Sequence, residues 1–210
     1  MNSLPYQSNR WLHRSYSLIA PFYDLLIENA LRTARKRSLS ALPDKITAQV
    51  LLSGVGTGLD LPMLPKLHRY TALDFNARML SRARPRATEL SMNFVLGDSM
   101  ALPFESAHFD HVLLHLITAV VPHPERCLGE AARVLKVGGT IILFDKFLQP
   151  RQPARLRRAL SPLSRHIATR MDVVFEEVLA AVPGLTLVSD EPLYGNGWFR
   201  GIVLRKTSQD

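Results

Sequence analysis

A short apolar run that ends in three closely spaced glycines constrains the fold more than any other feature of the chain. Gln49–Ser53 has the composition of a buried strand, and Gly54-Val55-Gly56-Thr57-Gly58 follows it directly. Glycine lets the backbone turn sharply and approach a ligand closely. We expect the turn to open a helix whose free N–H groups face polar ligand atoms. The pattern therefore predicts a ligand-binding turn at the end of a buried strand.

Further strands and helices alternate along the chain after this turn. The pattern predicts strands over 69–74, 92–96, 109–116 and 140–145, the last entered through the turn Gly138-Gly139, and two more around 185–188 and 198–205. Helices are expected over 76–90, where Pro85 would kink or end the helix, and over 125–135. This alternation predicts an α/β fold, a Rossmann-like, doubly wound, mostly parallel seven-stranded sheet with helices on both faces. In such sheets the ligand binds at the carboxyl ends of the strands.

Two helical segments precede the sheet, so we divide the chain into an N-terminal helical cap over 1–45 and a main domain over 46–210. Within the main domain, 150–182 is expected to form a helical insertion. Leu156, Leu160 and Leu163 have the spacing of an amphipathic helix, which Pro162 breaks or bends. This segment either packs on the domain or serves as a lid or a membrane contact.

The spacing of the glycines decides between kinds of ligand. A dinucleotide-binding turn needs G-x-G-x-x-G, and Leu59 stands where its third glycine would be. A phosphate-binding P-loop is excluded as well, because no Gly-Lys-Ser/Thr follows. The observed spacing is G-x-G-x-G, which needs another explanation.

Two acidic residues after the second and third strands favour a nucleoside. Asp74, 20 residues beyond Gly54, is placed to accept hydrogen bonds from both ribose hydroxyls, with a helix N-cap as the alternative. Asp98, followed by Ser99, is placed to accept a hydrogen bond from an adenine amino group, with a loop cap as the alternative. Phe75 either lies against the adenine ring or belongs to the core.

About 100 residues of the chain resemble the class I S-adenosylmethionine-dependent methyltransferases. The stretches that carry the resemblance are V-L-L-S-G-V-G-T-G, A-L-D-F-N-A-R-M-L, G-D-S-M-A-L-P-F, F-D-H-V-L-L-H-L and R-V-L-K-V-G-G. The resemblance implies methyl transfer from S-adenosyl-L-methionine, without a metal. The residues it implies for cofactor binding are Tyr16, Gly54, Gly56, Thr57, Gly58, Asp74, Phe75, Asp98, Ser99 and His115.

Within this class, Y-S-L-I-A-P-F-Y-D over 16–24 is similar to the N-terminal motif of two groups, the ubiquinone/menaquinone-biosynthesis methyltransferases and the bacterial phosphatidylethanolamine N-methyltransferases. The similarity implies a small-molecule or phospholipid-headgroup acceptor, of amine or quinone type. It implies that Tyr16 and Tyr23 line the cofactor and substrate side, unless they only pack the N-terminal helices. The candidate catalytic residues are His115, as a general base, and Tyr23; the alternative for His115 is a role in ordering its loop.

One position departs from the family pattern. An acidic residue usually stands two positions before the first glycine, where it helps to hold the methionyl ammonium group, and this chain has Leu52 there. An apolar side chain cannot accept that hydrogen bond. Asp24 and Asp60 are candidates to replace it. Because of this departure, a second function stays as an alternative: a non-catalytic regulatory protein that binds S-adenosylmethionine.

The net charge of +8 lies mostly outside the central segment, because residues 1–48 carry seven Lys/Arg against three Asp/Glu. Basic flanks suit an anionic membrane surface, although a merely solvated surface would look the same. They also keep an RNA methyltransferase as an alternative. Against nucleic acid, His115-Leu116-Ile117-Thr118 replaces the N/D-P-P-Y/F signature of many such enzymes, and no RNA-binding module is visible. The single cysteine and the lack of a long apolar run predict a cytoplasmic protein, able to lie at the inner face of the membrane.

Overall fold

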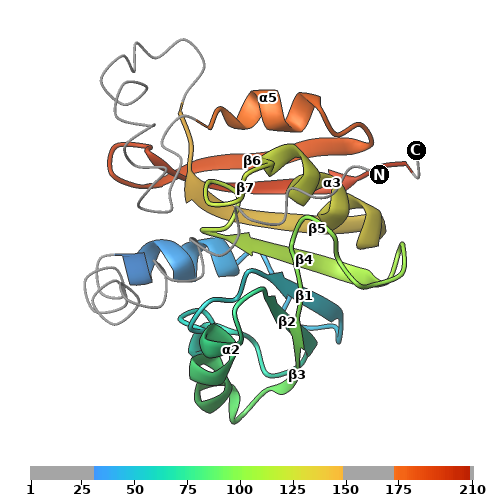
Figure 1. The fold of residues 1–210 in the computed structure, drawn as a ribbon. Helices are drawn as coiled ribbons and strands as arrows, with labels where there is room; N and C mark the ends of the chain where they lie inside the picture. Colours follow the sequence, from blue (N-terminus) through green and yellow to red (C-terminus); the bar gives the residue numbers. More distant parts are fainter. Residues whose placement is uncertain (1–30, 149–172, 209–210) are drawn as a thin grey trace, which may run out of the picture.

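A computed structural model describes residues 31–148 and 173–208, which form a seven-stranded sheet with helices packed against it (Figure 1). The strands are β1 (Gln49–Ser53), β2 (Arg69–Asp74), β3 (Ser91–Leu96), β4 (Phe109–His115), β5 (Leu135–Lys146), β6 (Leu185–Tyr194) and β7 (Phe199–Lys206). The helices are one over residues 31–39, α2 (Ala77–Ala83), α3 (Pro124–Val134), α5 (Phe175–Ala180), and the short 3₁₀ helices η1 (Leu61–Met63) and η2 (Arg84–Ala87). Among the described helices, none is long and apolar enough to span a membrane.

The strand order is β3-β2-β1-β4-β5-β7-β6, and the first five strands in this order are parallel. Strand β7 pairs antiparallel with both β5 and β6. Because the carboxyl ends of the five parallel strands lie at one edge, the residues that follow these strands meet there. The predicted doubly wound, mostly parallel sheet is confirmed.

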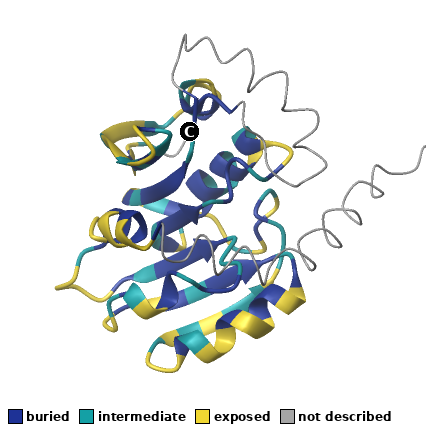
Figure 2. Ribbon diagram, turned by 90° about the vertical axis from the view of Figure 1, so that its left-hand side faces the viewer, coloured by how far each residue is buried: buried dark blue, intermediate teal, exposed yellow. Residues whose placement is uncertain are grey.

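Alternate residues of the central strands point into two separate cores. On one face, Leu51 and Leu114 pack in a core to which α3 and α5 contribute Leu128 and Phe175. On the other face, Leu52 and Leu113 pack with residues from the helix over 31–39, η1 and α2. Figure 2 shows the central strands and the inward sides of the helices as buried, and the outward sides of the helices as exposed. The period-two alternation fits a parallel sheet that is covered on both faces.

Proline explains how two of the helix predictions turned out: one helix is absent, and the other ends near Pro85 as expected. The glycine turn opens no α-helix: it leads through turns into the three-residue η1, because Pro62 and Pro65 lack the N–H groups that a longer helix would need. The helix expected over 76–90 ends as an α-helix at Ala83 and continues as η2, which contains Pro85.

Two strand boundaries were also wrong. Strand β5 begins at Leu135 rather than Thr140, and its register against β4 shifts between Phe109 and His111, so Gly138-Gly139 lies within an irregular stretch of the strand. Strand β6 extends to Tyr194, past the predicted end at Val188. Strand ends of this kind depend on pairing with neighbours, which a local pattern does not contain.

Candidate active site

The strand order reverses between β1 and β4. Strand β1 pairs with β2 on one side and with β4 on the other, so the chain winds outward from β1 in both directions. Open parallel sheets bind their ligands in the crevice at this point. The glycine turn follows β1, Asp74 ends β2, Asp98 follows β3 and His115 ends β4. The structure thus places these sequence-predicted residues at one edge of the sheet.

The glycine turn has a backbone that few other residues would adopt. Gly54, Gly56 and Gly58 have φ angles of 79°, 57° and 80°. A Cβ atom on Gly54 would lie 2.7 Å from the side chain of Ile117, whereas a Cβ on Gly56 would have no atom within 4 Å. Gly56 therefore borders open space, from which a ligand can reach the backbone closely. Thr57 beside it is buried, and its carbonyl accepts a hydrogen bond of 2.7 Å from Arg86 Nη1.

Asp74 holds the glycine turn in shape. Its Oδ2 accepts a hydrogen bond from the N–H of Gly56 over 2.8 Å, and its Oδ1 accepts one from the N–H of Asn76 over 2.9 Å. The N-cap of α2 is Asn76, whose side chain accepts from the N–H of Arg78. Asp74 itself is therefore not the helix cap that was its alternative.

The next three candidate residues, Asp98, Ser99 and Phe75, lie in different surroundings. Asp98 Oδ1 accepts from the N–H of Met100 over 2.8 Å, so the loop cap proposed as an alternative is present on one carboxylate oxygen. Ser99 is buried, and its hydroxyl accepts a hydrogen bond of 2.8 Å from Ser53 Oγ, which ties the loop after β3 to the end of β1. Phe75 is half-buried directly after Asp74.

His115 is the centre of a buried polar network at the end of β4. Its Nδ1 lies 3.1 Å from Asp60 Oδ2, and its Nε2 lies 3.1 Å from Ser38 Oγ. Arg35 Nη1 donates a hydrogen bond of 2.8 Å to Asp60 Oδ1. All four side chains belong to residues that are less than 10% exposed. Both ring nitrogens of His115 are thus engaged within the protein.

The charge state of Asp60 determines which atoms donate and which accept the hydrogen bonds around His115. Burial alone would raise the pKa of this carboxyl group, but the neighbouring His115 and Arg35 outweigh burial and hold the pKa well below its usual range. An ionised carboxylate only accepts hydrogen bonds, so Nδ1 of His115 carries a proton. In the neutral imidazole, Nε2 then accepts from the Ser38 hydroxyl.

Arg35 and Ser38 were not predicted as site residues. Both lie on the helix over 31–39, on the same face as the buried Leu31, Ala34 and Leu39. Two polar residues at i and i+3 on the apolar face of a helix were the signal that could have found them.

Leu52 has a plain packing role. Its side chain is 3% exposed and belongs to the core that includes Leu61 and Leu113. Of the two acids considered as replacements for the missing carboxylate, Asp60 lies in the His115 network, and Asp24 lies outside the described residues. Tyr16 and Tyr23 also lie outside them, as does most of the expected insertion over 150–182, so these assignments stay predictions.

Comparison with known proteins identifies the family. A model described as a methyltransferase domain matches residues 51–143. A phosphatidylethanolamine N-methyltransferase from Cereibacter sphaeroides is 32% identical over 191 residues, which cover 89% of this chain and 93% of that protein. The chain belongs to the class I S-adenosylmethionine-dependent methyltransferases. The resemblance found in the sequence is thereby confirmed, together with the cofactor it implies.

Two further matches place this methyltransferase more broadly. A demethylmenaquinone methyltransferase from Thermus thermophilus is 32% identical over 142 residues, covering 62% of this chain and 63% of that protein. A Haloferax volcanii methyltransferase, solved with the Trm112 methyltransferase activator, has a TM-score of 0.75 at 21% identity, covering 93% of this chain and 99% of that chain. At this identity the structural likeness shows the fold alone.

The methyltransferase's described residues suit the chemistry of this cofactor. S-adenosylmethionine combines an adenosine with a charged amino acid and a sulfonium. The open space beside Gly56 accommodates an approaching ligand, and the carboxylates of Asp74 and Asp98 are hydrogen-bond acceptors at the same edge. A buried pair of opposite charges, Arg35 and Asp60, lies toward β4. The described residues contain no group of three His, Cys, Asp or Glu side chains placed to hold a metal ion.

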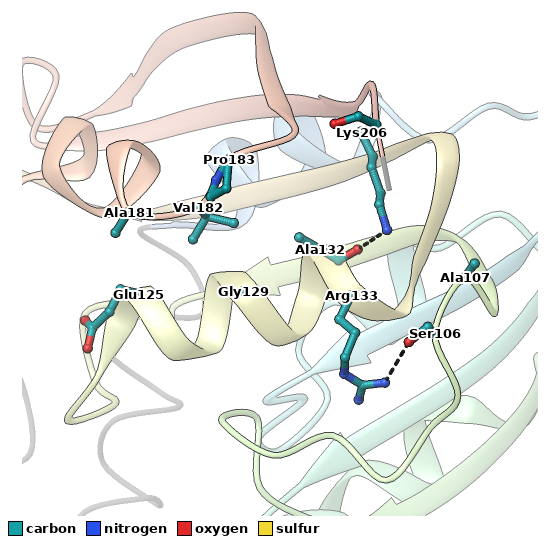
Figure 3. A pocket seen from close by; sticks show the side chains of 11 residues that line it. Ser106, Ala107, Glu125, Gly129, Ala132, Arg133, Ala181, Val182, Pro183 and Lys206 are labelled. Carbon is teal, nitrogen blue, oxygen red and sulfur yellow. Dashed lines mark hydrogen bonds between the residues drawn. The ribbon is translucent and has the colours of Figure 1, made fainter. Parts of the chain in front are cut away.

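A cavity of about 560 Å³ lies at the opposite edge of the sheet, between α3 and the segments on either side of β6 and β7 (Figure 3). Its size would suit a small ligand. However, Lys206 Nζ donates to the carbonyls of Ala132 and Leu135, and Arg133 is bound to Glu130 and to backbone carbonyls. The cations of this cavity therefore stabilise the end of α3, and the cavity is remote from the glycine turn.

Proposed function

We propose that this methyltransferase transfers a methyl group from S-adenosylmethionine to the amine of a phospholipid head group. The observation that carries the proposal is the match to the phosphatidylethanolamine N-methyltransferase, which spans 89% of this chain and 93% of that protein. The match to the demethylmenaquinone methyltransferase spans only 62% and 63%. A quinone-type or other small-molecule acceptor is the second candidate, and the experiment below separates the two.

The surface near the site supports an anionic lipid partner. The helix over 31–39 exposes Arg32, Lys36 and Arg37, while its opposite face packs at the active-site edge of the sheet. Arg37 forms an exposed ion pair with Glu191 at 3.1 Å, which offsets one of these three positive charges. Basic residues attract the negative surface of a membrane, each contributing about 1 kcal/mol near that surface.

We assign the adenosine end of the cofactor to the β1–β2 side of the crevice. In this assignment Asp74 accepts from the ribose hydroxyls, Asp98 from the adenine amino group, Phe75 lies against the ring, and Gly56 lets the ligand approach the backbone. Gly54, Gly58, Thr57 and Ser99 act mainly by holding the turn and the neighbouring loop. The cofactor would then extend toward β4 and His115.

His115 is the proposed proton acceptor for an amine substrate. When bound, the cofactor supplies a methyl carbon that the lone pair of the acceptor attacks in line. An amine that enters as an ammonium group must first lose a proton, since only the neutral form has that lone pair. Ser38 Oγ could take the proton while passing its own to Nε2 of His115, and the carboxylate of Asp60 would stabilise the resulting imidazolium.

Labelled-methyl transfer tests the acceptor. We expect purified enzyme and methyl-labelled S-adenosylmethionine to label phosphatidylethanolamine in vesicles that also contain anionic lipid. Vesicles of phosphatidylcholine and anionic lipid, which lack the primary amine, are the matched control. Label in a demethylated quinone and not in the lipid would favour the second candidate, and label only in RNA would contradict both.

The pH dependence of a His115→Gln variant tests the proton acceptor. Loss of a general base typically slows a reaction by about 10²-fold or more, so we expect a deficit of this order at pH 7. The deficit should shrink as the pH approaches about 10, where an alkyl amine loses its proton without help. A deficit that stays constant with pH would show that His115 has only a structural role.

A further inference from the structure

The buried pair Arg35–Asp60 has unused hydrogen-bonding capacity. Asp60 is the N-cap of η1, yet its side chain makes no capping hydrogen bond. Its two oxygens accept one hydrogen bond each, from Arg35 and His115, although a carboxylate has about four acceptor positions. Nε of Arg35 is buried and has no hydrogen-bond partner among the residues that the structure describes. A buried unpaired N–H is costly, and such groups normally find a partner in a ligand or water.

The Arg35–Asp60 pair lies on the β4 side of the crevice, away from Asp74 and Asp98. Asp60 stands two residues beyond Gly58, the last glycine of the turn, and its carboxylate contacts His115 at the end of β4. Asp74 and Asp98 lie on the β2–β3 side of the same edge. A ligand with its adenosine over β2 therefore directs its other end toward β4, where Arg35 and Asp60 lie.

At this position the end of β1 offers no charged group. Leu52 packs in the core, and Ser53 donates its hydroxyl to Ser99. The other end of S-adenosylmethionine is an amino acid, with an ammonium and a carboxylate on one carbon. In a buried setting each of these charges needs a partner of opposite sign.

We propose that the Arg35–Asp60 pair binds the amino-acid end of the cofactor. Asp60 accepts hydrogen bonds from the ammonium group, and Nε of Arg35 donates to the carboxylate group. Two positive and two negative charges then alternate, so the buried site stays neutral. The low pKa of Asp60 keeps it ionised for this role. The inference depends on the cofactor and not on the proposed lipid acceptor.

Calorimetry with two ligands tests the proposal. S-adenosylhomocysteine has the amino-acid end, whereas methylthioadenosine keeps the adenosine and lacks that end. We expect Asp60→Asn to weaken the first ligand by about tenfold or more, as for a lost hydrogen bond between charged groups, and to leave the second unchanged. Asp74→Ala should weaken both. Equal weakening of both ligands by Asp60→Asn, or no effect on either, would overturn the proposal.

A second measurement does not depend on the folding of a variant. Analogues of S-adenosylhomocysteine that lack either the ammonium or the carboxylate group should bind the unaltered protein about tenfold more weakly. Where the Asp60→Asn variant folds, the deaminated analogue should bind it as well as it binds the unaltered protein, because the interaction between the ammonium group and the Asp60 carboxylate is absent in both cases. Full affinity for both analogues would exclude Arg35 and Asp60 as ligands, whether or not the lipid is the acceptor.

Discussion

An Asp74→Ala variant is expected to lose at least about tenfold in affinity for S-adenosylhomocysteine, because hydrogen bonds to a charged group are worth about 1.5–3 kcal/mol each. The structure makes this loss larger than a ribose contact alone would. The carboxylate also accepts from the N–H of Gly56 at 2.8 Å and from that of Asn76 at 2.9 Å, so its removal releases the glycine turn. Titration calorimetry measures the effect.

The control for this variant is Asp44→Ala. Asp44 is an exposed acid before β1, so its removal tests for a general effect of lost negative charge. We expect the affinity of Asp44→Ala to match that of the unaltered protein. An Asp74→Ala protein that keeps its fold and its full affinity would refute the assignment of Asp74 to the cofactor.

A Gly58→Val variant is expected to lose roughly 3 kcal/mol of unfolding free energy, or more, from two causes that act together. The φ angle of +80° is unfavourable for a β-branched residue. A Cβ atom would also lie 2.8 Å from Leu61 Cδ1 and 3.0 Å from Cα of Ala83, so α2 would have to move. Urea denaturation, followed by circular dichroism, measures the change.

Gly129→Ala is the matched control for the glycine prediction. Gly129 lies inside α3, and a Cβ atom there would have no atom within 4 Å. Alanine is favoured over glycine within helices by about 1 kcal/mol, so this variant should be as stable as the unaltered protein or more so. If Gly58→Val were as stable as Gly129→Ala, the turn would not be packed against α2 as described.

Local signals explain why much of the fold was predictable. The strands β1, β2 and β4 are short, largely apolar runs, of which β1 is followed by Gly54 and β2 ends in Asp74, and the alternation of strands with helices fixes the edge at which the carboxyl ends meet. For this reason Asp74, Asp98 and the glycine turn could be placed together from the sequence. The shortness of the η1 helix could also have been predicted, because Pro62 and Pro65 are visible in the sequence.

The buried polar network of His115, Asp60, Arg35 and Ser38 could not be predicted in the same way. His115 was singled out, but its partners Asp60 and Ser38 stand 55 and 77 residues away, and Arg35 stands 25 residues from Asp60. No local pattern encodes such pairings, and an arginine in a basic helix ordinarily points to solvent. Helical spacing places Arg35 and Ser38 on the apolar face of the helix over 31–39, but only the packing of this helix on the sheet shows which residues they bind.

The structure of a complex with S-adenosylhomocysteine tests the central claim, that the cofactor lies across the ends of β2, β1 and β4. We expect the ribose hydroxyls within hydrogen-bond distance of Asp74, and the amino-acid end between Arg35 and Asp60. Binding of the ligand in the cavity beside Lys206, or in the reverse direction with the amino acid at Asp74, would contradict the account.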